Sequence, residues 1–582
     1  MPNHPDCPAE RAAADPVFAR PVPLAERWTA ALLLLAALAL RCFYIFRFRY
    51  DSDEPQHLHT TWNWTQGLLQ YRDFFDNHTP LFHFLFSPLV AAIGETPDIL
   101  TYMRFAMVPL WAASLWAVWM LGRRLFSARA GLWGAVFIAL LPWWFFPALE
   151  YRTDNLWTPL WLCALVVLLT GRLTGWRAFA GGAVLGVAAC VSMKTSVLVG
   201  VSALAAGISL LCAWRWERGL LAHAARVTLA FLAGIVLAPA FLCAIFAAKG
   251  CWAAFYYCVI QHNTILDVDA NVHPWWQRLA FPLALPFLIL LAARLIRRAP
   301  SPALALRWSF LFLFAGLYYT ALDSFWALLT RQDYLPFYPV AAVLAAPLVL
   351  WLARKARVGS SGGAALLAVL GCAEIALILG GRPPQVDGTR DQRELLGQVL
   401  QLTRPGEWVM DFKGQSVFRR RAFYYVIEPL TVCRIKRGLI EDTVARDLVG
   451  KGVCVVVNRQ LSYGKKTFEF LSENYLAAGQ VRVAGRVLSK AETVPGATLS
   501  FPVAIAAPYV LWADGQPVRG LLDGQPYAGE RLLTPGQHTF LPEGTYPHLD
   551  LLWERAAADG CFPVANQPGW LYENARALPA NR

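Results

Sequence analysis

The sequence predicts a polytopic α-helical membrane protein of about eleven spans, followed by an extracytoplasmic C-terminal region with an α/β part and a β-rich part. Of its 582 residues, 57% are hydrophobic and only 16% are charged, whereas soluble domains carry about 25% charged residues. Apolar runs of membrane-spanning length recur along the first two thirds of the chain. This composition excludes a water-soluble enzyme and a disordered chain, and 12 cysteines are too dilute for a disulfide scaffold.

Eleven runs without a charged side chain predict the spans, because a helix needs about 20 apolar residues to cross the hydrocarbon core. The runs are residues 28–40, 105–122, 130–149, 155–171, 178–193, 195–214, 227–248, 279–293, 308–322, 334–353 and 358–373. Only Lys194 separates the fifth run from the sixth. A single straight helix over both runs would measure ~55 Å, so we expect a hairpin with Lys194 at its turn.

The segments between the runs alternate in charge, and this alternation predicts the topology. One set of loops holds the cations Arg123, Arg124, Arg129, Arg172, Arg177, Arg215, Arg218, Arg226, Arg294, Arg297, Arg298, Arg307, Arg354, Lys355 and Arg357. The other set holds the acids Asp51, Asp53, Glu54, Asp73, Asp76, Glu150, Asp154, Asp267, Asp269, Asp323 and Asp333. By the positive-inside rule, residues 1–25 form a cytoplasmic tail and the chain after residue 381 lies outside.

The same pattern accounts for the net charge of +13, so no nucleic-acid partner is needed to explain it. Residues 1–26 are polar and rich in Pro and Ala, without an apolar core before a small-residue cleavage site. We therefore expect no cleavable signal peptide, and the first span serves as the insertion signal.

The region after the last span changes character and is divided here into residues 382–494 and 495–582. In the first part, apolar runs at 453–457 and 481–487 predict strands, with a helix over 467–478 between them. In the second part, Asp514-Gly515-Gln516-Pro517 recurs as Asp523-Gly524-Gln525-Pro526, and Asp-Gly between apolar stretches favours tight hairpins. We interpret this β-rich module as a structural cap, with a carbohydrate-binding module as the alternative.

The most informative polar segment is the loop of residues 49–97 after the first span. Asp51, Asp53 and Glu54 lie within four residues, and repulsion between such carboxylates tends to raise at least one pKa. A carboxylate of this kind at a membrane surface suits a general base that deprotonates a hydroxyl or an amine. The alternative is a solvated acidic loop. His57 and His59 follow, but their spacing carries no metal-site signature.

Several short motifs occur in a fixed order on the predicted outer side. They are Asp53-Glu54 after the first span, Pro80-Leu81, Arg104, Arg152-Thr153-Asp154, Gly186 through Lys194, and Arg331-Gln332-Asp333-Tyr334-Leu335-Pro336. Taken together, these motifs resemble those of the GT-C membrane glycosyltransferases, in the branch of the protein O-mannosyltransferases and the lipid A aminoarabinose transferases. The resemblance covers residues 26–381, and the C-terminal region has no recognisable motif.

The resemblance implies a GT-C-like membrane domain and inverting transfer of a hexosyl or pentosyl group from a polyprenyl-phosphate donor. The acceptor would be a lipid, a glycan or a protein at the outer face of a bacterial cytoplasmic (inner) membrane, with the C-terminal domain in the periplasm. The implied catalytic residues are Asp53, Glu54 and Asp154. The expected donor-phosphate site consists of cations at outer span ends and one tyrosine: Arg104, Lys194, Arg278, Arg331 and Tyr334.

Three histidines receive weaker assignments from the same resemblance. His57 and His78 are expected in the substrate loop, and His273 resembles a histidine of the fourth outer loop that can join a metal site. His78-Thr79-Pro80 departs from the acidic or Lys residue followed by Pro-Pro that relatives often have. The sequence therefore assigns no cofactor and leaves a divalent metal open.

The chemistry of these side chains fits the implied reaction, but each has a simpler interpretation. Fixed Lys and Arg residues stabilise the charge that develops on a phosphate leaving group. Lys194 could instead extend to the interface as a snorkelling lysine, and Arg331 could be an interfacial anchor. Two other functions remain open, a flippase of lipid-linked sugars and a non-catalytic glycan-binding assembly protein. A transporter predicts paired internal repeats, and we find no convincing repeat.

Overall fold

The computed structural model describes residues 21–213, 218–264, 275–326, 329–355, 360–457, 464–513, 515 and 517–563. The chain divides into two compact units. The membrane unit comprises Met1–Arg49, Asn77–Leu85 and Thr101–Gly388, and the second unit comprises Tyr50–Asp76, Phe86–Leu100 and Thr389–Arg582. Most of the loop that follows the first span therefore belongs to the same unit as the C-terminal region.

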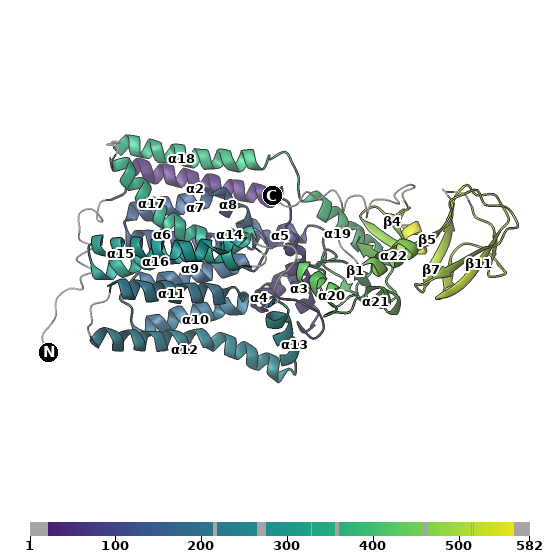
Figure 1. Cartoon of the computed structure of the whole chain (residues 1–582). Coiled ribbons are helices and arrows are strands. Elements are labelled where there is room, and N and C mark those ends of the chain that lie inside the picture. Colours follow the sequence, from purple (N-terminus) through teal and green to yellow (C-terminus); the bar gives the residue numbers. More distant parts are fainter. Residues whose placement is uncertain are drawn as a thin grey trace. The chain divides into compact units, whose positions relative to one another are not determined.

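The membrane unit is a bundle of helices, and its long helices run side by side in Figure 1. Its elements are α2 (Leu24–Ile45), α5 (Ile99–Phe105), α6 (Val108–Leu125), α7 (Ala128–Leu140), α8 (Pro142–Phe145), η1 (Pro147–Leu149), α9 (Asp154–Leu169), α10 (Gly175–Val191), α11 (Thr195–Ala213), α12 (Arg218–Ala248), α13 (Trp252–Tyr256), η2 (Tyr257–Gln261), α14 (Trp275–Arg278), α15 (Ala280–Arg298), α16 (Pro302–Phe325), η3 (Arg331–Tyr334), α17 (Phe337–Lys355) and α18 (Ser360–Gly381). The helix α4 (Leu81–Ile93) begins in this unit and ends in the second one.

Each of the eleven predicted runs overlaps a helix. Among the described residues, eight helices are long and apolar enough to cross a membrane, and the bent pair Ala128–Leu140 and Pro142–Leu149 makes a ninth span. The two remaining runs correspond to α9 and α10, which are apolar helices of 16 and 17 residues. The protein is a polytopic α-helical membrane protein, as predicted, although the count of eleven requires these two short helices.

Two breaks in the bundle position loops of the candidate functional site. The pair formed by α7 and the α8–η1 segment bends by 68° at Pro142, because proline has no N–H to continue the helical hydrogen bonds. The helices α10 and α11 are separated by Ser192–Lys194, where the sequence predicts a turn. Lys194 therefore lies at a helix end and not in the middle of a long helix.

Glycines let α10 approach α12 closely. A Cβ atom on Gly182 would lie 2.2 Å from the carbonyl oxygen of Phe231, and one on Gly234 would lie 2.2 Å from that of Phe179. Small residues at such contacts allow two backbones to pack directly, which is a common basis of helix association in membranes. Any larger residue at these positions would separate the two helices.

The second unit contains a mixed sheet of eight strands. The strands are, in order, β10 (Arg531–Leu533), β7 (Ala507–Trp512), β12 (Leu549–Trp553), β5 (Val481–Ser489), β3 (Val455–Val457), β1 (Trp408–Met410) and β2 (Arg420–Arg421), and β4 (Tyr475–Ala478) also pairs with β5. Strand β1 is parallel to both β2 and β3, and the other pairs are antiparallel. Strands on both sides of residue 494 thus share one sheet.

Helices and a second sheet complete this unit. The helices are α3 (Asp53–Thr65), α19 (Arg390–Leu402), α20 (Pro429–Lys436), α21 (Val444–Gly450), α22 (Lys465–Asn474) and α23 (Glu554–Ala558). The four-stranded sheet has the order β6 (Leu499–Val503), β11 (Gly536–Pro542), β8 (Gly520–Leu522) and β9 (Gln525–Pro526). The buried core includes Leu395 of α19, Val409 of β1 and Val455 of β3.

Two sequence predictions in this unit can be compared with the structure. Asp523 and Gly524 have φ values of 52° and 73° and join β8 to β9 as a two-residue hairpin loop, which confirms the predicted Asp-Gly hairpin. The helix predicted over residues 467–478 is too long, because α22 ends at Asn474 and the next four residues form β4. Gly479, with φ 65°, turns β4 back onto β5.

Candidate functional site

Three loops of the membrane unit bring charged side chains together around Lys194. Lys194 lies in the break between α10 and α11, Asp154 is the first residue of α9, and Asp333 lies in η3. Lys194 Nζ is 3.1 Å from Asp154 Oδ1 and 2.7 Å from Asp333 Oδ1. Arg152 Nε lies 3.3 Å from the other carboxylate oxygen of Asp154. We call these four residues the Lys194 cluster.

Hydrogen bonds hold the segment that carries Asp333. Its Oδ2 accepts hydrogen bonds from the backbone N and the hydroxyl of Thr330, at 2.7 and 2.8 Å, which is a capping arrangement at the start of η3. The Tyr318 hydroxyl donates to the Asp333 carbonyl at 2.9 Å. Gln332 donates to Glu150 Oε2 at 2.7 Å and so ties η3 to the turn before α9. The geometry of the cluster is therefore fixed from several sides.

The Lys194 cluster keeps its lysine charged. The side chains of Asp154 and Asp333 are only 1% and 2% exposed. Burial opposes the charge on Lys194, but the two carboxylates outweigh burial and raise the pKa of Lys194 above its ordinary value. A preorganised ammonium group is suited to stabilising charge on a departing phosphate.

Three arginines lie close to the ring of Phe48, just after α2. The guanidinium carbons of Arg49 and Arg382 each lie 5.6 Å from the ring centre, and that of Arg104 lies 5.8 Å from it. Burial, together with the charges of Arg49 and Arg331, lowers the pKa of Arg382. We call Arg49, Arg331 and Arg382 the arginine group. Because a bound anion would relieve the repulsion between these like charges, the arrangement suits a phosphate.

Arg104 has structural partners within the same unit. Its guanidinium donates hydrogen bonds to the carbonyls of Phe48 and Arg49, at 2.7 and 2.8 Å, and is fully buried. Arg278, at the end of α14, is exposed and forms no hydrogen bond or ion pair with the residues that the structure describes. Among the predicted donor-site cations, Lys194 contacts the two carboxylates, and the charge of Arg331 acts on Arg382.

Tyr334 follows Asp333 in η3 and lies among aromatic side chains. Its ring centre is 5.3 Å from that of Tyr319 and 6.2 Å from that of Tyr338. Burial raises the pKa of Tyr334, so its hydroxyl stays protonated and can donate a hydrogen bond at neutral pH. The phenol is thus chemically suited to contact a phosphate oxygen.

The predicted histidines lie in different places. His78, in the membrane unit, interacts electrostatically with Asp154 and has its ring centre 6.4 Å from that of His83. His57 is buried on α3 in the second unit. His273 lies outside the described residues. Within the described ranges, no group of three or more His, Cys, Asp or Glu side chains could hold a metal ion.

In the second unit, Asp53 and Glu54 begin α3. Asp53 forms an ion pair with Lys413, and the two side chains remain 18% and 15% exposed. Glu54 is buried, and its Oε1 accepts a hydrogen bond from the backbone N of Asp51 at 2.8 Å. Glu54 therefore stabilises the first turn of the helix, whereas the carboxylate of Asp53 stays accessible.

Lys413 is carried by a tight loop, residues 411–418, that packs on α3. Gly414 has a φ of 80°, and a Cβ atom there would lie 2.8 Å from the Pro55 carbonyl oxygen. Asp411 accepts hydrogen bonds from the backbone N of Gly414 and of Ser416, at 3.0 and 2.9 Å. The loop can therefore approach α3 closely only with glycine at position 414.

A buried ion pair and a buried histidine stabilise this loop. Asp411 and Arg421 form an ion pair of 3.6 Å, with side chains at most 3% exposed. Burial lowers the pKa of His59 to about 4, so its ring is neutral at physiological pH. Its Nδ1 then donates to the Val417 carbonyl at 2.8 Å. A neutral histidine and one ion pair thus anchor the loop that presents Lys413.

Sequence analysis missed five residues of these clusters as site residues. Arg152 and Asp333 lie inside the Arg152-Thr153-Asp154 and Arg331–Pro336 motifs, and Arg382 follows the last span, so the sequence offered a local signal for these three. Arg49 and Lys413 carry no motif of their own. Lys413 is 360 positions away from Asp53, and no local pattern in the sequence connects the two residues.

Comparisons with known proteins place the fold. No protein-family model and no curated protein sequence matches the chain. The crystal structure of ArnT from Cupriavidus metallidurans bound to undecaprenyl phosphate matches with a TM-score of 0.55 and 14% identity, over 78% of this chain and 97% of ArnT. The apo state of the same ArnT matches with a TM-score of 0.52, at the same identity and coverage.

A more distant match is the apo oligosaccharyltransferase of Archaeoglobus fulgidus, with a TM-score of 0.49, 12% identity, and coverage of 90% of this chain and 95% of that one. The two ArnT structures are sufficient to assign the architecture. The chain therefore has the fold of the GT-C membrane glycosyltransferase superfamily, to which the lipid A aminoarabinose transferase ArnT belongs, as its sequence motifs predict.

Proposed function

We propose that the protein is a membrane glycosyltransferase that uses a polyprenyl-phosphate-linked hexose or pentose as donor. The acceptor is a lipid, glycan or protein at the outer face of a bacterial inner membrane, and transfer proceeds with inversion. The observation that carries the proposal is the GT-C fold, matched over 97% of ArnT, a protein crystallised with undecaprenyl phosphate. The cation clusters at loop ends of the membrane unit support it.

The arginine group is the proposed binding site for the donor phosphate. Arg331 and Arg382 supply planar guanidinium groups, which bind phosphate oxygens in pairs, and Arg49 adds a third charge beside them. Tyr334, in the same 3-10 helix as Arg331, offers a neutral hydroxyl. Lys194 is the fixed ammonium that balances charge as the phosphate leaves. Arg104, with its carbonyl partners, positions the backbone around Phe48.

Asp53 is the proposed general base. It accepts the proton from the acceptor hydroxyl or amine while the acceptor oxygen or nitrogen bonds to the anomeric carbon. The bond between that carbon and the phosphate oxygen breaks on the opposite face, and the polyprenyl phosphate leaves with the electron pair. Glu54 and Asp154 are positioning residues, because Glu54 caps α3 and both oxygens of Asp154 contact cations.

Transfer of radiolabelled sugar from undecaprenyl-phosphate hexoses and pentoses in proteoliposomes tests this function. Arg331→Gln and Arg382→Gln should each raise the KM for the donor by about tenfold or more, as expected for a lost charge-assisted contact. Arg446→Gln is the control, because Arg446 is an exposed surface residue paired with Glu441. Movement of the donor across the bilayer without transfer would identify a flippase. Glycan binding without sugar transfer and without movement of the donor would identify an assembly protein.

The N-in, C-out orientation is part of the proposal and is tested separately. Gln385 follows α18, on the side that the positive-inside rule assigns to the periplasm. A Gln385→Cys variant should react with a membrane-impermeant maleimide in intact spheroplasts more strongly than the parent protein does. Labelling of the introduced thiol only after lysis would reverse the assigned orientation.

A further inference from the structure

The membrane unit has a pocket of about 520 Å³ at the end of the bundle away from the Lys194 cluster. Arg172 follows the last residue of α9, and Ser301 precedes α16, whereas Asp154 begins α9 and η3 follows α16. At 1.5 Å per residue, the 16 residues of α9 separate the two ends by ~24 Å. The pocket is thus distinct from the proposed donor site.

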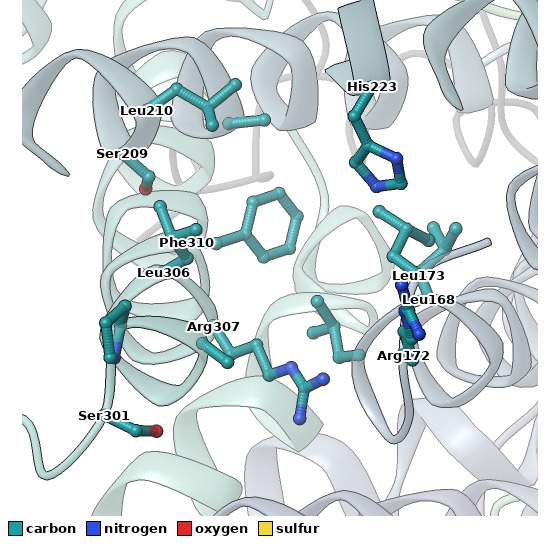
Figure 2. Close-up of a pocket in the computed structure, with 14 residues that line it drawn as sticks. Leu168, Arg172, Leu173, Ser209, Leu210, His223, Ser301, Leu306, Arg307 and Phe310 are labelled. Carbon is teal, nitrogen blue, oxygen red and sulfur yellow. The ribbon is translucent and has the colours of Figure 1, made fainter. Parts of the chain in front are cut away.

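The lining of this pocket is amphiphilic. Of the fourteen described residues that line it, nine are apolar, among them Leu168, Leu210 and Phe310. Figure 2 shows the side chains of Arg307, Phe310 and His223 directed into one space from α16 and α12. A volume of this size lies within the range of small-ligand pockets, and its apolar wall suits a hydrocarbon chain.

The polar part of the lining carries positive charge. Arg307 donates a hydrogen bond to the Gly171 carbonyl at 2.6 Å, which holds its guanidinium beside the end of α9. Arg172 lines the pocket, is exposed, and forms no hydrogen bond or ion pair with any residue in the described ranges. Among the residues that the structure describes, no Asp or Glu lines the pocket. Its charge therefore complements an anion.

We propose that this pocket binds an acidic phospholipid of the bilayer, with its phosphate between Arg172 and Arg307 and an acyl chain along Leu168, Leu210 and Phe310. The arginine-rich loops at this end belong to the cytoplasmic leaflet by the positive-inside rule, and basic pockets between membrane helices on that side bind anionic headgroups. The proposal does not depend on the glycosyltransferase function.

Native mass spectrometry of the full-length protein in detergent, with added phosphatidylglycerol or phosphatidylcholine, tests this site. The parent protein should retain one phosphatidylglycerol more strongly than phosphatidylcholine. Arg172→Gln should weaken that adduct about tenfold, as expected for a lost charge-assisted contact. Arg124→Gln is the matched control, because Arg124 is an exposed arginine at the end of α6 that does not line the pocket. The α6 end lies at the same end of the bundle, where Trp308 of α16 donates to the Leu125 carbonyl.

Three results would overturn the proposal. The first is equal retention of phosphatidylglycerol and phosphatidylcholine by the parent protein. The second is equal loss of phosphatidylglycerol in Arg172→Gln and Arg124→Gln. The third is displacement of phosphatidylglycerol by equimolar undecaprenyl phosphate in the parent but not in Arg172→Gln, which would assign the pocket to the polyprenyl lipid instead.

Discussion

Each of the two units pairs a lysine with a predicted catalytic aspartate, and the two pairs differ in the burial of the aspartate. The lysines do not differ in that direction, since the side chains of Lys194 and Lys413 are 21% and 15% exposed. In the membrane unit, Lys194 lies between Asp154 and Asp333, whose side chains are 1% and 2% exposed. In the second unit, Lys413 contacts Asp53, and the side chains of Asp53 and Lys413 are 18% and 15% exposed. The carboxylate of Asp154 is therefore enclosed by its partners, whereas that of Asp53 stays partly exposed.

This difference separates the roles of the two aspartates. A buried carboxylate whose oxygens both contact cations is held as an anion by its surroundings, so it orients its partners. An accessible carboxylate at the start of a helix can receive a proton from a substrate and return it to water. The greater exposure of its carboxylate therefore favours Asp53 over Asp154 as the base, and substitutions at both residues test this assignment.

The largest expected effect is on the rate of transfer in Asp53→Asn. This substitution keeps the shape and removes the charge, so kcat should fall by about 10²–10⁴-fold, the usual range for a positioned acid–base group. Expression and thermal unfolding should stay close to those of the parent. Asp51→Asn is the control and should have a much smaller effect. Parental turnover in Asp53→Asn, with loss in Asp154→Asn, would transfer the base assignment to Asp154.

The next effect concerns stability of the membrane unit in Lys194→Met. Removing one partner from a buried ion pair leaves uncompensated charge, so the protein should lose about 3–5 kcal/mol of stability. Thermal unfolding in a defined detergent measures this loss. The double variant Lys194→Met/Asp154→Asn should recover part of it, because one of the two orphaned carboxylates is then neutral. A Lys194→Met protein as stable as the parent would contradict the idea that Lys194 completes a buried network.

A pH series tests whether burial of one titratable side chain in the second unit changes the stability of the protein. Folded His59 has a pKa of about 4, and an unfolded histidine titrates near 6.5. The unfolded state therefore binds the extra proton first, and up to ~3 kcal/mol of stability present above pH 6.5 should be lost as pH falls to 4. In His59→Gln, the unfolding temperature should depend less on pH over this window. His538 is the matched control. Although partial burial opposes its charge, Asp523 raises its pKa, so its contribution is lost as pH rises.

The smallest expected effect is on stability in Lys413→Met. Partly exposed ion pairs contribute about 0–1 kcal/mol, so the unfolding temperature should shift by only a few degrees. A loss as large as that of Lys194→Met would show that the two lysines are equivalent and would remove the distinction between the aspartates. The measurement is the same detergent unfolding experiment, run on both variants together.

The sequence allowed the membrane architecture to be predicted because apolar runs and loop charges are local signals. The break at Lys194 and the Asp523-Gly524 hairpin followed from helix length and turn chemistry within a few residues. The pairs Lys194–Asp333 and Asp53–Lys413 could not be predicted, since they depend on how distant loops pack. Likewise, the boundary at Asn474 depends on pairing of β4 with β5, which helix propensity does not include.

The close approach of α10 to α12 affects the position of Lys194, in the loop that follows α10. Gly182 lies nine residues before the end of α10, a distance of ~14 Å along its axis. Because the two backbones touch there, the height and rotation of α10 are set within the apolar interior, and with them the place where Lys194 emerges. The small volume of Gly182 deep in the bilayer thereby determines where the ammonium group of Lys194 lies at the bilayer surface, although the two residues do not touch.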